Sequence, residues 1–115
     1  PNKDTNPTHW TIKGTKMWIT NGTLDGSNTG DLFLVYAKTG PKRTDLTLFL
    51  VEKDIAGFSL GQQIKQKLGM RASPTAELVF DNVVVPHENV VGQVNGANMC
   101  MMRNLEIERL GLAAM

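Results

Sequence analysis

The sequence predicts a mainly β protein, a small antiparallel β-barrel or sandwich, followed by the start of an α-helix. Several short segments rich in β-branched and aromatic residues alternate with polar, glycine-containing loops, which is typical of strands joined by turns. Pro86 ends the last of these segments, because proline cannot donate to a β-ladder. From about Asn98 the apolar residues follow the period of a helix instead.

The first half of the chain predicts three strands. Residues 9–22, HWTIKGTKMWITNG, predict a β-hairpin whose turn is the Lys-Gly-Thr segment at residues 13–15. Residues 21–30 form a polar, glycine-rich loop that we expect to project from the surface. Residues 31–38, DLFLVYAK, predict the next strand.

A basic loop at residues 39–45 separates that strand from another, predicted at residues 46–53. Residues 77–86, ELVFDNVVVP, predict one or two further strands, with a turn or bulge at residues 81–82. The β part should therefore contain five to seven strands.

The predicted helix carries one stripe of residues at i, i+4, i+7 and i+11. The stripe comprises Met101, Leu105, Glu108 and Leu112. Asn95 or Asn98 could provide its N-cap. We expect a β domain at residues 1–94, followed by the start of a helix at residues 95–115. Because the chain lacks an initiator Met and stops within the helix, we expect it to be a piece of a longer protein.

Composition restricts the classes of function. A net charge of +1 gives no electrostatic reason to expect nucleic acid or an anionic membrane as partner, and no apolar run approaches the ~20 residues that span a bilayer. The single Cys100 excludes an internal disulfide and is a better candidate for helix packing than for nucleophilic catalysis. His9 and His87 lack partners at metal-ligand spacing, so no metal is predicted.

Glu108 stands where the apolar stripe calls for Leu or Met. Burial disfavours a charged carboxylate, and a carboxylate that holds a proton near neutral pH suits a general base. Glu106 lies about 200° around the helix and faces Arg103 and Arg109 instead. The alternative is that Glu108 reaches water and that Glu106 and Arg109 form a surface pair of about 0.3–0.5 kcal/mol.

Three longer motifs favour the catalytic interpretation. GTKMWITNG at residues 14–22, KLGMRASPTAELVFDNVVVP at residues 67–86 and LEIERLGLAA at residues 105–114 occur in this order. Together they resemble the acyl-CoA dehydrogenase family, from its middle β domain into the first helix of its C-terminal domain. The resemblance covers nearly the whole chain, and LEIERL is most similar to the isovaleryl-CoA branch.

The resemblance implies a role for the helix. Glu108 would be the catalytic base that takes the α-proton of the acyl thioester while a hydride passes to flavin N5. Arg109, Glu106 and Ile107 would contact the substrate, and Met99 matches a further substrate contact.

Two other segments match functional positions of the family. Trp18, Ile19 and Thr20 match its flavin-binding segment, with the ring of Trp18 against the isoalloxazine and the Thr20 hydroxyl near N5. Arg43 and Thr44 match positions that contact the CoA part of the substrate. The alternatives are that Trp18 and Ile19 are core residues of a strand and that Arg43 belongs to a solvated basic loop.

The implied reaction is α,β-desaturation of isovaleryl-CoA to 3-methylcrotonyl-CoA in leucine catabolism, with FAD as cofactor. The resemblance also implies a homotetramer, an electron-transferring flavoprotein as electron acceptor, and the mitochondrial matrix in a eukaryote or otherwise the cytoplasm. A long-chain or 2-methyl-branched acyl-CoA remains an alternative substrate, and a non-enzymatic β-barrel binding module remains an alternative class. The 115-residue chain alone is expected neither to hold FAD tightly nor to turn over substrate.

Overall fold

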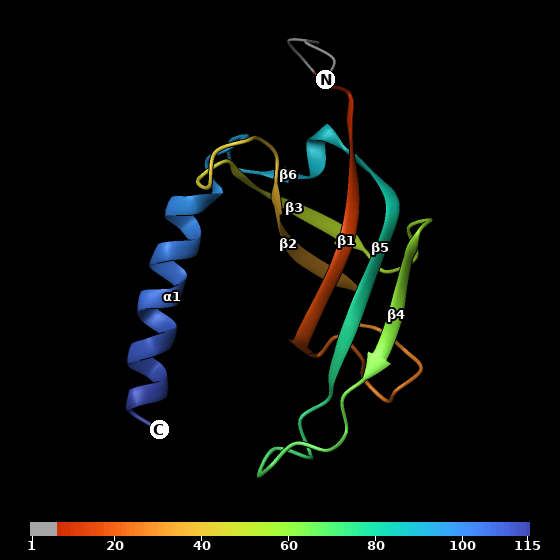
Figure 1. Cartoon of the computed structure of the whole chain (residues 1–115), viewed down its shortest axis with the longest axis vertical. Coiled ribbons are helices and arrows are strands. Elements are labelled where there is room, and N and C mark those ends of the chain that lie inside the picture. The colour runs from red at the N-terminus through yellow and green to blue at the C-terminus, as the bar shows by residue number, and fades with distance from the viewer. Residues whose placement is uncertain (1–6) are drawn as a thin grey trace. The chain divides into compact units, whose positions relative to one another are not determined.

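The computed structural model describes residues 7–115, so the first six residues of the predicted β domain lie outside the described part. Its elements follow one another along the chain as Figure 1 shows. They are β1 (His9–Thr20), β2 (Leu32–Lys38), β3 (Leu46–Glu52), β4 (Phe58–Gln63), β5 (Thr75–Pro86), a 3-10 turn (His87–Asn89), β6 (Val90–Val91) and α1 (Ala97–Ala113). The predicted mainly β fold with a terminal helix is confirmed.

The chain divides into two compact units. The described part of unit 1 comprises residues 7–33 and 51–87, and unit 2 comprises residues 34–50 and 88–115. One antiparallel sheet has the strand order β1-β5-β4, and a second has the order β2-β3-β6.

The first sheet shows that the predicted hairpin at residues 9–22 is wrong. Residues 9–20 form one continuous strand, which pairs antiparallel with β5 from His9 opposite Pro86 to Thr20 opposite Thr75. Gly14 adopts a φ of +145° next to a register shift. The glycine therefore lies within one long strand, beside the bulge that Asp81 and Asn82 make in β5, rather than in a turn between two strands.

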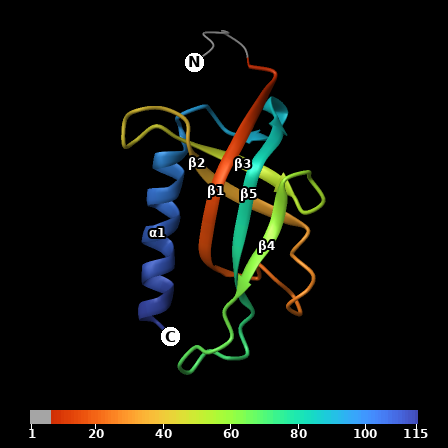
Figure 2. The ribbon, with the colours of Figure 1, turned by 45° about the vertical axis from the view of Figure 1, so that its right-hand side comes forward.

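The central strand of this sheet is β5, with β1 on one side and β4 on the other (Figure 2). The predicted irregularity at Asp81 and Asn82 is confirmed, because Ile12 pairs with Val83 and Gly14 with Phe80, and Asn82 has a φ of 52°. The strand nevertheless continues through this bulge to Pro86. The edge strand β4 was not predicted from the sequence.

Apolar side chains of alternating strand positions form the core of unit 1. The buried ones are Ile12, Phe33, Val51, Ala76, Leu78, Phe80, Val83 and Val85. Phe58 links this core to β4, since its ring centroid lies 5.1 Å from those of both Phe33 and Phe80.

Unit 2 contains β2 from Leu34 onward, β3 up to Leu50, the short strand β6 and the helix. Val35, Leu48, Phe49 and Ala97 are buried in it. The buried Thr47 hydroxyl lies 2.7 Å from that of Thr39 and accepts the backbone N–H of Asn95 at 2.8 Å.

The predicted N-cap at Asn95 or Asn98 is wrong. The helix begins at Ala97 after Gly96, which makes no side-chain cap hydrogen bond. The Asn95 side chain instead accepts a hydrogen bond from Thr39 at 2.5 Å, and its φ is 61°. The Asn95 side chain thus anchors the preceding loop rather than the first free N–H groups of the helix.

Candidate functional site

The three flavin-binding candidates lie at the end of β1, where this strand carries a bulge of its own. Lys16 pairs with Leu78 and Ile19 with Ala76, so Met17 and Trp18 together stand opposite the single residue Glu77. A bulge of this kind redirects the side chain of the extra residue.

Trp18 occupies a left-handed backbone conformation, with a φ of 63°. This conformation is costly for a bulky L-residue and often marks a functional position. The Trp18 side chain is 65% exposed, and Ile19 is half-buried. In unit 1, therefore, Trp18 is not the core residue that the alternative interpretation required.

Glu77 on the central strand β5 lies opposite the bulge of β1, a role that the sequence did not reveal. On its other side, Leu60 pairs with Leu78 and Gln63 with Ala76, so β4 bulges opposite the same residue. The Glu77 carboxylate accepts the backbone N–H of Gln62 at 3.1 Å. Its side chain thus satisfies a donor that the β4 bulge removes from the ladder.

An anchored turn follows the flavin-binding candidates. Asn21, with a φ of 59°, donates its N–H to the Pro74 carbonyl at 2.9 Å, and Gly22 donates to Ile19 at 3.1 Å. A Cβ on Gly22 would lie only 3.0 Å from the Ile19 carbonyl oxygen, so the tight turn favours glycine. The turn leaves the Thr20 hydroxyl at an exposed strand end, two residues from the exposed Trp18 ring.

The loop at residues 21–30 is ordered by its own polar side chains. Thr23 is fully buried and donates to the Asn28 carbonyl at 2.9 Å. The Asp25 carboxylate accepts the N–H groups of Asn28 and Ser27 at 2.7 and 2.8 Å. These backbone bonds, first that from Asn28, lower the pKa of Asp25 below the ordinary value of 3.8.

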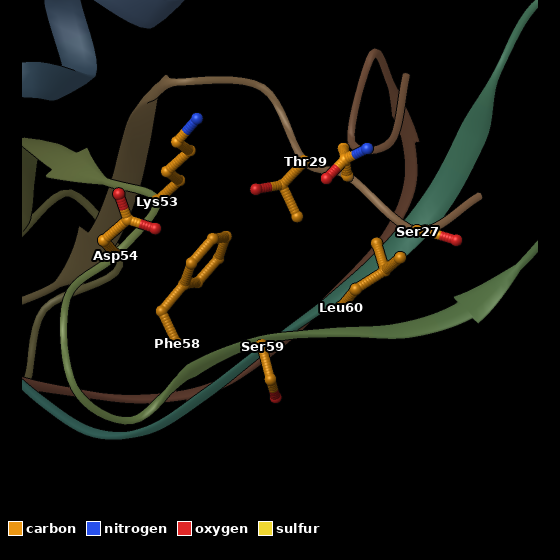
Figure 3. Close-up of a pocket in the computed structure, with 8 residues that line it drawn as sticks. Ser27, Thr29, Lys53, Asp54, Phe58, Ser59 and Leu60 are labelled. Atoms are coloured by element: carbon orange, nitrogen blue, oxygen red, sulfur yellow. The ribbon is translucent and has the colours of Figure 1, made fainter. Parts of the chain in front are cut away.

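Unit 1 also contains a pocket of about 300 Å³ that no sequence pattern indicated (Figure 3). It is lined by Ser27, Asn28, Thr29, Lys53, Asp54, Phe58, Ser59 and Leu60, none of which is a predicted site residue. Lys53 forms an ion pair with Asp31 at 2.7 Å. The hydrogen bond and positive charge of Lys53 lower the pKa of Asp31. In turn, the hydrogen bond to Asp31 and its negative charge raise the pKa of Lys53.

The CoA-binding candidates Arg43 and Thr44 lie in unit 2, in the turn between β2 and β3, and both are exposed. Asp45 holds this turn, since its carboxylate accepts the N–H of Lys42 at 3.0 Å and its own N–H donates to the Lys42 carbonyl at 3.1 Å. The turn therefore presents the Arg43 guanidinium to solvent, where a phosphate could reach it.

The remaining candidates lie on α1. Met99, Glu106, Ile107, Glu108 and Arg109 are all exposed. Along the predicted stripe, Met101 and Leu105 are half-buried, whereas Leu112 is 70% exposed. Within the described residues, apolar neighbours therefore do not shield Glu108 from water, because the stripe is covered only near the start of the helix.

The structure thus places the flavin candidates together in unit 1 and the acyl-CoA candidates in unit 2. Within residues 7–115, no three His, Cys, Asp or Glu side chains are grouped so that they could hold a metal ion. The only α-helix in that part of the chain is not long and apolar enough to cross a membrane.

Comparison with known proteins identifies the family. Residues 2–83 match the model of the acyl-CoA dehydrogenase middle domain. Mitochondrial isovaleryl-CoA dehydrogenase from Oryza sativa subsp. japonica is 47% identical over 109 residues, which cover 91% of this chain and 25% of that protein. Mitochondrial 2-methylacyl-CoA dehydrogenase from Solanum tuberosum is 46% identical over 107 residues, which cover 91% and 24%.

Among solved structures, an acyl-CoA dehydrogenase from Bacillus anthracis, complexed with FAD, is similar with a TM-score of 0.75. The two are 35% identical, and the match covers 89% of this chain and 16% of that one. The chain spans about a quarter of the length of the curated relatives it matches. It belongs to the acyl-CoA dehydrogenase family, whose middle-domain model covers most of its length.

Proposed function

We propose that this chain is part of an FAD-dependent acyl-CoA dehydrogenase that desaturates isovaleryl-CoA to 3-methylcrotonyl-CoA. Residues 1–94 would belong to the middle β domain, and residues 95–115 would be the first helix of the C-terminal domain. One observation carries the proposal: Trp18 is held out of a sheet by a bulge and a left-handed backbone, with its ring 65% exposed. The identity to isovaleryl-CoA dehydrogenase supports it.

The residues at the end of β1 fit a flavin. Trp18 offers an exposed aromatic face for a flat ring, and Thr20 offers an exposed hydroxyl that can donate a hydrogen bond. Ile19 lies between them in the sequence and is half-buried. Bound FAD would supply the hydride acceptor for the reaction.

Unit 2 supplies groups that suit an acyl-CoA. Arg43 can pair with a phosphate through two parallel hydrogen bonds, and Thr44 can donate a further one. Met99 and Ile107 present apolar surface to the acyl part, and Glu106 and Arg109 present polar groups. All of these side chains are exposed.

Glu108 would act as the base. Its carboxylate would accept the proton released when the Cα–H bond of the acyl thioester breaks. Since Glu108 is exposed in the described chain, we expect the bound substrate to exclude water from it.

A second acyl-CoA substrate also fits the similarity to known proteins. The similarity to a 2-methylacyl-CoA dehydrogenase, at 46% identity, keeps that substrate as a second candidate. An electron-transferring flavoprotein as acceptor and a homotetramer complete the proposal, as does the mitochondrial matrix for a eukaryotic source. These follow from the family resemblance.

The test uses the full-length protein. It should be yellow, and isovaleryl-CoA should bleach the flavin faster than 2-methylbutyryl-CoA or palmitoyl-CoA does. Glu108→Gln should retain the colour and lose at least about 100-fold in bleaching rate, because the amide cannot accept the proton. Glu88→Gln is a matched control, since Glu88 is also exposed and lies outside the candidate site.

Two results would contradict the proposal. A folded, colourless full-length protein would favour the binding module. A yellow protein whose Glu108→Gln variant bleaches at the normal rate would remove Glu108 from the reaction. A higher rate with 2-methylbutyryl-CoA would transfer the proposal to the second substrate.

A further inference from the structure

Tyr36 on β2 contacts one face of α1 within unit 2. The helix residues Cys100, Asn104 and Glu108 are spaced four apart, so they follow one another along the same face. Tyr36 is half-buried and 64 residues from Cys100 in the chain. The contact therefore ties the helix to a strand that is distant in sequence.

A small polar network makes this contact. The Tyr36 hydroxyl donates to Cys100 Sγ at 3.8 Å and accepts a hydrogen bond from Asn104 Nδ2 at 3.3 Å. Asn104 Nδ2 also lies 4.0 Å from Cys100 Sγ. The hydroxyl thus spans one turn of the helix, using both its donor and one of its acceptor positions.

Glu108 interacts electrostatically with the Tyr36 hydroxyl of this network. Burial raises the pKa of Tyr36 above 10.0, and the hydrogen bond to Cys100 adds to the rise, while that from Asn104 opposes it. The negative charge of Glu108 raises it further. The hydroxyl is consequently protonated and able to donate at neutral pH, within the electrostatic reach of the proposed base.

Other contacts of α1 are concentrated at its start. Ala97 is its only buried residue, Met101 and Leu105 are half-buried, and every residue from 106 onward is exposed. Since most of the stability of a helix in a protein comes from tertiary packing, the middle of α1 depends on its contacts with the rest of unit 2. The Tyr36 network lies at that point, one turn before Glu108.

We propose that Tyr36, acting through Asn104 and Cys100, is a positioning residue that fixes the rotation of α1 and thereby the direction in which Glu108 points. This inference rests on the proposed function, in which Glu108 is the base. Tyr36 itself touches no reacting atom. Its loss should therefore weaken proton abstraction most. Substrate binding should weaken less, because Glu106, Ile107 and Arg109 lie on the same helix whereas Arg43 and Thr44 do not.

The test compares Tyr36→Phe and Asn104→Ala with wild type in the full-length holoenzyme. Each should lower kcat for isovaleryl-CoA about 10- to 100-fold, because a misdirected base costs that much, and should raise KM by a smaller factor. The isotope effect on kcat with α-deuterated isovaleryl-CoA should rise, since proton abstraction becomes slower relative to other steps. A merely destabilised protein would lose active molecules without changing the isotope effect.

A second measurement does not depend on activity. In the apoprotein, amide hydrogen exchange at residues 100–108 should be at least about fivefold faster in both variants. Because the two residues share one hydrogen bond, the double variant should exchange no faster than the more affected single variant. Met102→Ala is the matched control, because Met102 lies about 200° around the helix from Asn104. This variant should leave kcat, KM, the isotope effect and amide exchange near their wild-type values.

The outcomes separate the two proposals. If Glu108→Gln is inactive while Tyr36→Phe has wild-type kcat and isotope effect, the positioning role is wrong and the proposed function stands. If Glu108→Gln is active, the proposed function fails and the positioning role fails with it. Unchanged amide exchange in both variants would also overturn the inference, whatever the kinetics.

Discussion

Replacing Trp18 with glycine should leave the protein more stable than replacing it with alanine. Both substitutions remove the indole ring, so the difference between them depends on the backbone. At an ordinary strand position, alanine is more stable than glycine by about 0.5–1 kcal/mol, because glycine loses more backbone entropy on folding. Trp18 has a φ of 63°, where an L-residue with a Cβ pays about 1–2 kcal/mol and glycine does not.

The net expectation is that Trp18→Gly is more stable than Trp18→Ala by about 0.7 kcal/mol, the difference between the midpoints of these ranges. Thr11 provides the control on the same strand, since it pairs with Val84 and is exposed. There, Thr11→Ala should be more stable than Thr11→Gly by about 0.5–1 kcal/mol. The sign of the difference should therefore reverse between the two positions.

The assay is urea unfolding of the 115-residue chain, followed by tryptophan fluorescence. Trp10 remains in the Trp18 variants and reports on unit 1, because its Nε1 donates to His87 Nδ1 at 3.0 Å and the two rings stack. If Trp18→Ala is as stable as Trp18→Gly or more stable, residue 18 is not held in the left-handed conformation, and the argument for a bulge that presents the ring fails. In the full-length protein, both variants should lose FAD affinity to a similar extent, as judged by flavin release during dialysis.

Two further predictions concern unit 1. Gly57→Ala should destabilise the chain by about 1–3 kcal/mol more than Gly69→Ala. Both glycines have a positive φ, of 86° and 73°, so the backbone cost is similar. A Cβ at Gly57 would lie 2.3 Å from the Asp81 carbonyl oxygen, whereas a Cβ at Gly69 would meet nothing within 4 Å. Equal urea midpoints for the two variants would contradict this. The lowered pKa of Asp25 means that its hydrogen bonds stabilise the loop above the ordinary value of 3.8 and are lost as the pH falls through the lower folded value. The amide chemical shifts of Ser27 and Asn28 should therefore titrate with a midpoint below 3.8, and the titration should be absent in Asp25→Asn; a midpoint at 3.8 or above would disprove the assignment.

The sequence by itself determined the elements whose signal is local. Runs of β-branched and aromatic residues located β2 and β3 to within a residue or two, and the change to helical periodicity located α1. The polar edge strand β4, FSLGQQ, has no such run, and its pairing with β5 alone makes it a strand. The three motifs of the resemblance indicated the family, which the comparisons confirm.

The tertiary structure decided features that depend on distant partners. Lys-Gly-Thr at residues 13–15 is compatible with a turn, and only pairing with residues 79–83 makes it part of one continuous strand. The same partner strand places Trp18 in a bulge opposite Glu77, and the Trp18 ring is exposed there. From the sequence alone, a buried position in the core was an equally good prediction. Local sequence fixes the preferences of neighbouring residues, but exposure and the direction of a side chain depend on which distant strand or helix lies beside it.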